Sequence, residues 1–600
     1  MHGVHGRLLH IDLATGLSEA RPIPDAVFRE VLGGNGLASW LLLEWCPPGA
    51  DALGPENPLI FATSPFVGTG ITTASKVAVA AKSPQTGMIG DSLSSSYLAL
   101  ALKRTGFDAL VITGRARDMS LLVVDDDRVE IRPARHLLGL DPVMTAEAVR
   151  LETSAGFRVA AIGVAGERLV SYAAIANDGR LAGRTGTGAV MGSKNLKAIA
   201  VSGSHLPQVA HPAELARAAR ELARKSLGPG SAKYREIGTA ANLAFFSRIG
   251  ILPTRNFQSG SFEQANAISG ETLFAEHRVD KHACAACTIG CEHHYRTSDD
   301  GSETTVRLEY ESLFALGSLC GIADPNVVLR AAALCDMLGI DAISTGVTIA
   351  WAMECVERGV DVGYPIEELP RFGDGASVLR VIQAIGERVG LGELLALGTR
   401  AASAQVGQGS DAWAMHVKGL EMPGYDPRKL RTLALGLAVG TRGACHSRSS
   451  AYEIDLSDRL TPRAEAHVRA RAAADAEDQA AVLDSLTICK FLRHCFDDLY
   501  DETANLYSLV TGIPTTADDL RQAGTRITAV KKTFNIRQGW TRADDTLPPR
   551  VFDGDSLTRE RLDELIDAYY TVRGWDEHGI PQAGVPVLFS SMVLVGECSG

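Results

Sequence analysis

Short apolar runs dominate the first 200 residues of the chain. They are rich in Val, Ile, Leu and Ala and are bounded by Gly, Pro or Asp, and they cover residues 6–16, 57–65, 76–84, 108–116 and 120–134. Short apolar runs between turn-forming residues are typical of β-strands. The pattern predicts a β-rich N-terminal domain over residues 1–208.

The pattern changes after residue 208. Apolar residues recur every three to four positions in residues 211–226, 326–339, 376–390 and in a long stretch over 461–495. This spacing places apolar side chains on one face of an α-helix. A weaker change lies near residue 417. We therefore predict an α+β fold, in which the β domain is followed by two mainly helical domains, 209–417 and 418–600.

Composition narrows the class of protein. A chain of 600 residues is too long for one hydrophobic core. The net charge of −12 argues against nucleic acid as the main partner, because phosphate binding requires a basic surface. We see no signal-peptide pattern and no apolar run of about 18 residues, so we expect a cytoplasmic protein without a membrane span. Eleven cysteines in such a chain favour reduced thiols and metal ligation.

Three cysteines lie close together with the spacing C-x2-C-x3-C: Cys284, Cys287 and Cys291. Structural zinc sites and 4Fe–4S clusters normally use four protein ligands. In one interpretation the site binds zinc, and a nearby histidine supplies the fourth ligand. The candidates for that ligand are His282, His293 and His294.

Two similar hexapeptides suggest another fourth ligand. DMLGID at residues 336–341 and DSLTIC at residues 484–489 both follow a helical pattern. Two helical domains could present these segments towards a common point. Because the second hexapeptide ends in Cys489, a distant thiol could complete the cysteine site.

Glycine-rich segments indicate a bound cofactor. They cover residues 32–36, 64–70, 83–92 and 177–195. Glycine allows backbone N–H groups to approach a phosphate or heterocycle, and Arg180, Arg184 and Lys194 in the last segment could bind anionic oxygens. None of these segments has the spacing of a nucleotide-binding motif. Together they favour a large anionic cofactor.

Ordered motifs along nearly the whole chain resemble one known family. They include GRLLHIDLATG, VLGGNGLASWLLL, KSPQTG, LKRTGFDALVITGRA, AAIANDGRLAGRTGTGAVMGSKNLKAIAV, CAACTIGC, EYESLFALGSLCGI, CDMLGIDAISTG, MPGYDPR, RGACHS and FNIRQGWTRADDTLPPRVF. The chain resembles the aldehyde ferredoxin oxidoreductases, which are tungsten or molybdenum bis-pyranopterin enzymes. The resemblance implies that the N-terminal domain is the base on which two pyranopterins lie, covered by the helical domains.

The resemblance also implies specific binding residues. Cys284, Cys287, Cys291 and Cys489 match the ligands of one 4Fe–4S cluster. Asp336 and Asp484 match the two pterin-binding aspartates, and a magnesium ion between the pterin phosphates would be held by the carbonyls of Leu93 and Leu181. The other matched cofactor positions are Lys76, Ser94, Ser95, Arg180, Gly339, Asp341, Arg448 and Ile488.

Several positions depart from the family pattern. Lys76 replaces an arginine that has a bidentate fork, Ser94–Ser96 replace a Ser-Gly-Gly segment, and Thr487 replaces a glycine. Arg330 and Ala333 stand where the archetype has a Glu and a His that bind a dimer-bridging iron. We therefore expect a homo-oligomer or hetero-oligomer without bridging iron.

Glu311 and His446 match the two titratable residues of the family's active site. In an apolar pocket the pKa of Glu311 would rise, which suits a general base that activates water, and His446 could stabilise developing negative charge. Cys320 and Cys445 lie in the same motifs. We interpret them as packing residues, with ligation of the metal as the rival interpretation.

The resulting functional hypothesis is oxidation of a small aldehyde to a carboxylic acid. Electrons would pass through the cluster to ferredoxin or an iron–sulfur partner subunit. One alternative is the catalytic subunit of an aromatic acyl-CoA ring reductase on the same scaffold. Another is a zinc-stabilised protein without enzyme activity.

Overall fold

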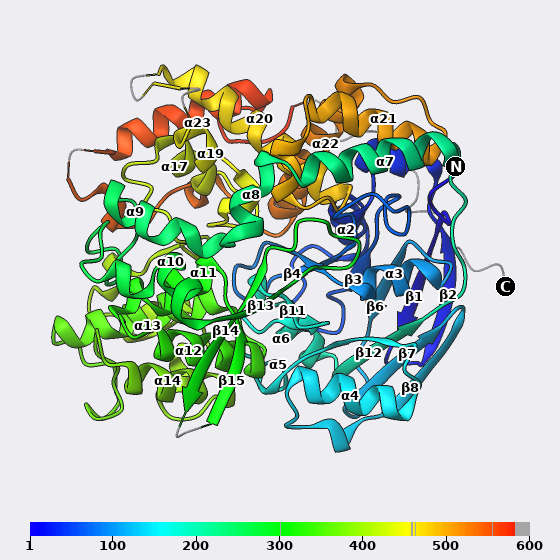
Figure 1. Ribbon diagram of the computed structural model, residues 1–600. Coiled ribbons are helices and arrows are strands. Elements are labelled where there is room, and N and C mark those ends of the chain that lie inside the picture. The colour runs from blue at the N-terminus through cyan, green and yellow to red at the C-terminus, as the bar shows by residue number, and fades with distance from the viewer. Residues whose placement is uncertain (300–301, 458–459, 462–463, 555, 583–600) are drawn as a thin grey trace.

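The N-terminal part of the chain forms two six-stranded mixed sheets (Figure 1). The computed structural model describes residues 1–299, 302–457, 460–461, 464–554 and 556–582. In the first sheet the order is β2 (Leu17–Pro22), β1 (Arg7–Asp12), β6 (Ala109–Thr113), β3 (Leu59–Ala62), β4 (Lys76–Lys82) and β5 (Ile89–Ser95). In the second it is β11 (Arg180–Ala182), β10 (Ile175–Asn177), β9 (Arg158–Ala161), β12 (Leu196–Ser202), β7 (Ser120–Asp125) and β8 (Arg128–Pro133).

Each predicted strand region contains a strand of these sheets. The central strands β3, β4 and β6 are buried along almost their full length, which explains their continuous apolar runs. β1 pairs with β6 and β7 with β12 in parallel, and the other neighbours are antiparallel.

The sequence pattern missed helices in this part of the chain. They include α2 (Gly34–Trp45), α3 (Tyr97–Arg104), α4 (Pro142–Glu152) and α6 (Thr187–Ser193). Ten of the twelve residues of α2 are buried, so its apolar residues show no one-sided spacing. The glycine-rich segment 32–36 is therefore the start of a helix. A Cβ on Gly34 would lie 2.6 Å from the carbonyl oxygen of Ser485, so glycine allows α2 to pack closely there.

Helices dominate the rest of the chain, as predicted. The predicted regions contain α7 (Pro212–Ser226) and all but the first residue of α12 (Pro325–Leu338) and of α14 (Gly375–Glu387). Helix α20 (Ala466–Ser485) covers only part of 461–495. Residues 462–463 of that last region lie outside the described residues. Other helices are α8 (Pro229–Glu236), α11 (Tyr310–Leu316), α13 (Ala342–Glu357), α17 (Arg431–Ala438), α18 (His446–Ser449), α21 (Leu499–Thr511), α22 (Ala517–Arg537) and α23 (Arg559–Arg573).

A small sheet interrupts the helical part and was not predicted. Its order is β13 (Arg278–His282), β14 (Glu292–Asp299) and β15 (Ser302–Arg307), and the three clustered cysteines lie in the connection from β13 to β14. In Figure 1 this sheet lies between the helices α11–α14 and the N-terminal half. The cysteine segment therefore lies where the two parts of the molecule meet.

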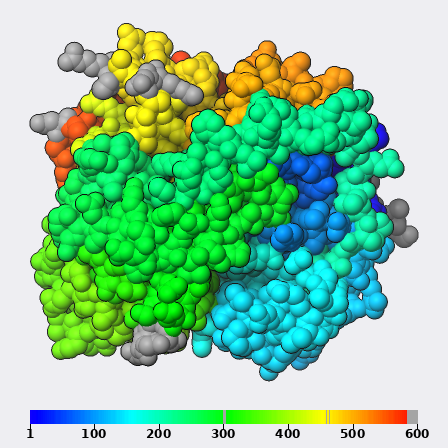
Figure 2. Space-filling model, in the orientation of Figure 1, coloured from blue at the N-terminus to red at the C-terminus, as the bar shows by residue number. Residues whose placement is uncertain are grey.

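The C-terminal helices pack against the N-terminal half. Helix α2 contacts both α20 and α22, and Ile527, Val530 and Phe534 of α22 share a core with residues of the first sheet. One large core also joins residues from both sides of position 417. The space-filling view shows the green segment in continuous contact with its yellow and blue neighbours (Figure 2). No described helix is long and apolar enough to cross a membrane.

Candidate active site

A cavity of about 500 Å³ opens among α8, the N-terminus of α11, α18 and residues 490–494. Its wall is rich in aromatic side chains: Tyr234, Phe245, Phe246, Tyr310, Tyr425, Tyr452 and Phe491. Tyr234 stacks on Phe491 with ring centres 4.1 Å apart. Polar and charged side chains, among them Lys233, Glu311 and His446, complete the lining. The cavity therefore combines apolar surface for a small organic molecule with polar groups that can orient it.

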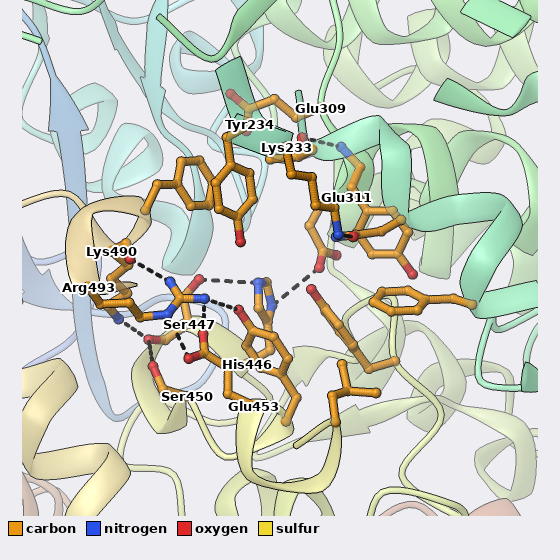
Figure 3. A pocket seen from close by; sticks show the side chains of 18 of the residues that line it. Lys233, Tyr234, Glu309, Glu311, His446, Ser447, Ser450, Glu453, Lys490 and Arg493 are labelled. Carbon is orange, nitrogen blue, oxygen red and sulfur yellow. Dashed lines mark hydrogen bonds and ion pairs between the residues drawn. The ribbon is translucent and has the colours of Figure 1, made fainter. Parts of the chain in front are cut away.

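Glu311 and His446 face each other in this cavity (Figure 3). Oε1 of Glu311 lies 3.3 Å from Nδ1 of His446, and the side chains are 19% and 15% exposed. The backbone N–H of Gly424 donates to Oε2 of Glu311 at 3.1 Å. Among the described residues neither Oε1 nor Nδ1 has a well-aligned hydrogen-bond partner. Both atoms can therefore still bind a substrate atom or water.

Burial shifts the proton equilibria of this pair. It raises the pKa of Glu311 to about 8, although the Gly424 N–H and Arg184 act in the opposite direction. Burial also lowers the pKa of His446 well below its ordinary value, and Arg184 and Lys490 lower it further. At neutral pH the carboxyl therefore holds a proton beside an uncharged imidazole.

The four predicted cluster cysteines come together in the structure. Burial raises the pKa of the Cys287 and Cys291 thiols, and the neighbouring thiols of Cys284 and Cys489 raise both further. All four are free cysteines. Since Cys489 lies on the C-terminal side of α20, the fold brings it to the β13–β14 connection from far along the sequence.

A segment of the N-terminal domain holds this cysteine site. The Thr73 N–H donates to the carbonyl oxygen of Ala286 at 2.8 Å, and the Ser75 hydroxyl donates to that of Ala285 at 2.5 Å. The Cys489 N–H donates to the Thr73 hydroxyl at 3.1 Å. Lys76 follows directly and begins β4. Residues 73–76 thus join the cysteine site to the N-terminal sheet.

The two hexapeptides have similar backbone conformations. Gly339 and Thr487 occupy the equivalent fourth position and have φ values of 72° and 60°. A β-branched residue is strained in this left-handed region. Thr487 is held there by a 2.8 Å hydrogen bond between its hydroxyl and that of Ser64. The similarity predicted from sequence is therefore also present in three dimensions.

Each hexapeptide aspartate lies near cations. Asp336 is 3.8 Å from Arg307, yet burial dominates and raises its pKa. Asp484 lies 2.8 Å from Arg448 and 3.2 Å from Lys490. Burial would raise the pKa of Asp484, but these cations outweigh it and the pKa is lowered. Asp484 is thus ionised at neutral pH.

Asp91 is a central residue that the sequence analysis missed. It is buried on β5 and accepts from Arg448 at 2.9 Å, from Lys531 at 2.8 Å and from Asn35 at 2.6 Å. Arg442 approaches it to 3.6 Å, and Nε of Arg442 has no hydrogen-bond partner among the described residues. The segment GMIGDS contains Asp91, but a single Asp after a glycine gives no signal of burial.

The remaining predicted binding positions lie along the sheet edges. Leu93, Ser94 and Ser95 are on β5, Arg180 and Leu181 are on β11, and these two strands contact each other. The Ser94 hydroxyl donates to Asn177, whose buried Nδ2 has no partner among the described residues. Asp341 caps the N-terminus of α13 and lies 3.4 Å from Arg184, and Ile488 is buried after α20.

The three basic residues of segment 177–195 have partners within the protein itself. Arg184 donates to the carbonyl oxygens of Ala444 at 2.7 Å and Glu421 at 2.5 Å. Lys194 donates to carbonyl oxygens within the N-terminal half. Arg180 forms an ion pair with Glu292. Backbone carbonyls thus take two donors each of Arg184 and Lys194. Binding of a cofactor anion by the three residues stays a prediction.

The two cysteines near the active site have different environments. Cys320 is buried among apolar residues, which raises its pKa to about 12 and fits a packing role. Burial also opposes ionisation of Cys445, but Arg442, Arg448 and Arg184 lower its pKa to about 7. Nη2 of Arg442 lies 2.8 Å from Cys445 Sγ. Cys445 is therefore more than an inert packing residue.

Sequence comparisons identify the family. Residues 8–203 match the model of the aldehyde ferredoxin oxidoreductase N-terminal domain, and residues 214–585 match that of domains 2 and 3. The chain belongs to the aldehyde ferredoxin oxidoreductase family. It is thus an enzyme of an oxidoreductase family, and the resemblance seen in the sequence is confirmed.

Related proteins match the chain over nearly its whole length. The tungsten-containing aldehyde ferredoxin oxidoreductases of Pyrococcus furiosus and Thermococcus kodakarensis are each 36% identical, and the matches cover 96% of this chain and 97% of each relative. An aliphatic sulfonate oxidoreductase WOR-like subunit of P. furiosus is 28% identical, covering 98% of this chain and 96% of that protein. The family is clear, whereas the substrates named for its members differ.

A solved structure supports the predicted fold class. The active site complex BamBC of benzoyl coenzyme A reductase with 1,5-dienoyl-CoA superposes with a TM-score of 0.83 at 24% identity, covering 97% of this chain and 96% of that chain. This likeness concerns the fold alone. Together with the family match it confirms the α+β class of this aldehyde ferredoxin oxidoreductase family member.

Proposed function

We propose that the chain oxidises aldehydes to carboxylic acids with a tungsten or molybdenum bis-pyranopterin cofactor. Electrons pass through one 4Fe–4S cluster to ferredoxin or an iron–sulfur partner subunit. The observation that carries the proposal is the buried Glu311–His446 pair, 3.3 Å apart in an aromatic-walled cavity. The names of the relatives at 36% identity favour aldehydes and tungsten.

The described residues fit a large anionic cofactor. Arg442, Arg448 and Lys531 surround Asp91, so positive charge exceeds negative charge at this buried position. Nε of Arg442 at this position and Nδ2 of Asn177 beside Ser94 have no partners among the described residues and remain available to an acceptor oxygen. Asp336 and Asp484 would bind the two pterins through their carboxylates.

Magnesium fits at the contact between two strands. Leu93 lies on β5 and Leu181 on β11, and these strands are adjacent. Carbonyl oxygens are ligands that magnesium accepts alongside phosphate oxygens. We propose that these two carbonyls and the pterin phosphates hold the ion.

The cysteine set supports an iron–sulfur cluster over zinc. In a tetrahedral zinc–thiolate site the sulfurs lie about 3.8 Å apart, as follows from a bond length of about 2.3 Å. Within the described ranges, no group of three potential metal ligands closer than 4.8 Å includes any of the four cysteines. The four sulfurs are therefore not as close together as in a zinc site, which favours a larger group on Cys284, Cys287, Cys291 and Cys489.

The reaction adds one oxygen atom to the aldehyde carbon. Aldehyde and water yield carboxylic acid, two protons and two electrons, and the bound metal cofactor would accept the electrons. Glu311 in its ionised form accepts a proton from the attacking water. Neutral His446 donates its other ring N–H to the aldehyde oxygen, which stabilises negative charge as it develops. The aromatic wall holds the substrate and keeps bulk water away.

Anaerobic purification followed by metal analysis and turnover assays tests the proposal. We expect tungsten or molybdenum, about four iron atoms per cluster, and aldehyde-dependent reduction of ferredoxin or a viologen. Reduction of an aromatic acyl-CoA without aldehyde turnover would replace this function with the ring-reductase alternative. Family membership already argues against a zinc scaffold without activity. The three-domain division and a cytoplasmic location remain predictions.

A further inference from the structure

The β13–β14 hairpin carries four metal-ligand side chains on one face. In its antiparallel register Asp280 pairs with His294, and His282 pairs with Glu292. Residues two apart on a strand point to the same side, and paired residues share a face. The four side chains therefore form a compact group outside the active-site cavity, which none of them lines.

Three of these side chains converge at bonding distances. Potential ligand atoms of Asp280, His282 and His294 all lie within 4.8 Å of one another. Oxygens of Asp280 lie 3.2 Å from Nε2 of His282 and 3.1 Å from Nδ1 of His294. Ligands of tetrahedral zinc, at about 2.0–2.1 Å from the ion, are about 3.3 Å from one another. The observed separations are close to this value.

A second carboxylate orients His294. Nε2 of His294 lies 2.9 Å from Oε1 of Glu292, and Glu292 also pairs with Arg180. Metal-binding histidines commonly donate their other ring N–H to a carboxylate, which fixes the tautomer and leaves the opposite nitrogen free to bind metal. With Glu292 as acceptor, Nδ1 of His294 presents its lone pair towards Asp280 and His282.

We propose that Asp280, His282 and His294 bind a divalent transition-metal ion, with zinc as the metal that this ligand set favours. Two imidazoles and one carboxylate suit zinc, cobalt or nickel, and water can fill the open position. Asp280 is half-exposed and His294 less so, which gives a hydrated ion access.

The position of the site suggests what the metal does. His282 ends β13 just before Cys284, and Glu292 begins β14 directly after Cys291. A metal joining the two strands here would close the base of the loop that carries the three clustered cysteines. The ion would thus stabilise the cluster loop without contacting the cluster.

Cobalt titration of the purified holoenzyme tests the site. Co²⁺ in a four-coordinate site of three protein ligands and one water gives intense visible d–d bands, whereas the bands of octahedral hexaaquo cobalt are weak. We expect about one equivalent to bind with these bands, competed by Zn²⁺. In His282→Ala and Asp280→Asn the affinity should fall at least tenfold. The matched control is His277→Ala, because half-buried His277 directly precedes β13 and bonds only to a backbone carbonyl in the described structure.

Three outcomes would overturn the proposal. They are a wild-type titration without d–d bands, unchanged binding in His282→Ala, and an equal loss in His277→Ala. Iron content and the reduced cluster signal serve as the check on folding. If His282→Ala loses iron, its cobalt affinity says nothing about the proposed site. The wild-type titration and the Asp280→Asn variant then test the proposal.

Discussion

Glu311 Oε1 lies 3.3 Å from His446 Nδ1, although the two residues belong to different helices far apart in the sequence. Burial raises the pKa of Glu311 and lowers the pKa of His446. At neutral pH the carboxyl is therefore protonated and the imidazole uncharged, so the pair carries no net charge. Such a pair can take up and release a proton during catalysis with little rearrangement.

Replacing Glu311 by glutamine should strongly reduce aldehyde oxidation. Glutamine retains the shape and can still accept from the Gly424 N–H, but it cannot accept a proton from water. Loss of a general base typically costs about 10²–10⁴-fold in kcat. His446→Ala should also lower kcat, and the double variant should lose less than the product of the single effects. Steady-state kinetics with metal analysis measures both.

Exposed Glu357 on α13 provides a matched control. Glu357→Gln makes the same chemical substitution outside the cavity and should leave kcat within about twofold of wild type, as is usual for surface positions. Near wild-type turnover in Glu311→Gln with full metal content would show that this carboxylate is not the base.

The activity should depend on pH through Glu311. A base with a pKa of about 8 is mostly protonated below that pH, so kcat/KM should rise with pH and level off above about 8. Below this value the rise approaches tenfold per pH unit. In Glu311→Gln the residual rate should lack this inflection. A flat wild-type profile between pH 6 and pH 9, measured at about constant ionic strength, would contradict the assignment.

The fold was predictable for helices with one exposed face and for strands that are buried along almost their full length. The strands β3, β4 and β6 and the helices α7 and α14 gave clear patterns for this reason. Helix α2 did not, since it is buried on nearly all sides against the sheet and the C-terminal helices. The β13–β15 sheet was missed because all three strands consist mainly of polar residues and β13 is exposed along its whole length.

Sequence motifs predicted residues of the candidate site, but they did not predict the charged contacts among those residues. Cys489 and Asp484 followed from the hexapeptide similarity and the family resemblance. Asp91 and the ion pair of Arg180 with Glu292 did not, because charge pairing depends on which segments the fold brings together. Arg184 shows the same limit, since two of its partners are backbone carbonyls and the third is the distant Asp341.

Cys489→Ala should remove or degrade the iron–sulfur cluster. The thiolate is one of four proposed ligands, and a 4Fe–4S cluster needs each of them for stability. Iron content and the reduced-state EPR signal should fall together. Cys495→Ala is the matched control, because Cys495 lies on the same segment, is buried, and packs against apolar neighbours. An intact cluster in Cys489→Ala would place the fourth ligand elsewhere.

Iron should amount to about four atoms per chain, the content of one 4Fe–4S cluster. Arg330 and Ala333 supply no carboxylate–imidazole pair for an iron that bridges subunits. Metal analysis after anaerobic purification, combined with EPR of the oxidised enzyme, measures this. A reproducible excess of iron with a mononuclear signal would contradict the prediction, whereas additional zinc would not.

The two hexapeptides should respond differently to substitution at their shared left-handed position. Gly339→Ala places a Cβ at φ 72° and 2.9 Å from the Gly163 nitrogen, so backbone strain of about 1–2 kcal/mol adds to a steric clash. Thr487→Gly relieves similar strain but loses the buried hydrogen bond to Ser64, worth about 1 kcal/mol.

These magnitudes predict that only one of the two variants is clearly destabilised. Gly339→Ala should lower the free energy of unfolding and reduce tungsten or molybdenum content, because the strained turn displaces Asp336 and Asp341 from their positions. Thr487→Gly should stay within about 1 kcal/mol of wild type, since strain relief and the lost hydrogen bond nearly cancel. Thermal unfolding and metal analysis of both variants measure the contrast. Equal destabilisation would show that Thr487 is not strained and that the two turns are not equivalent.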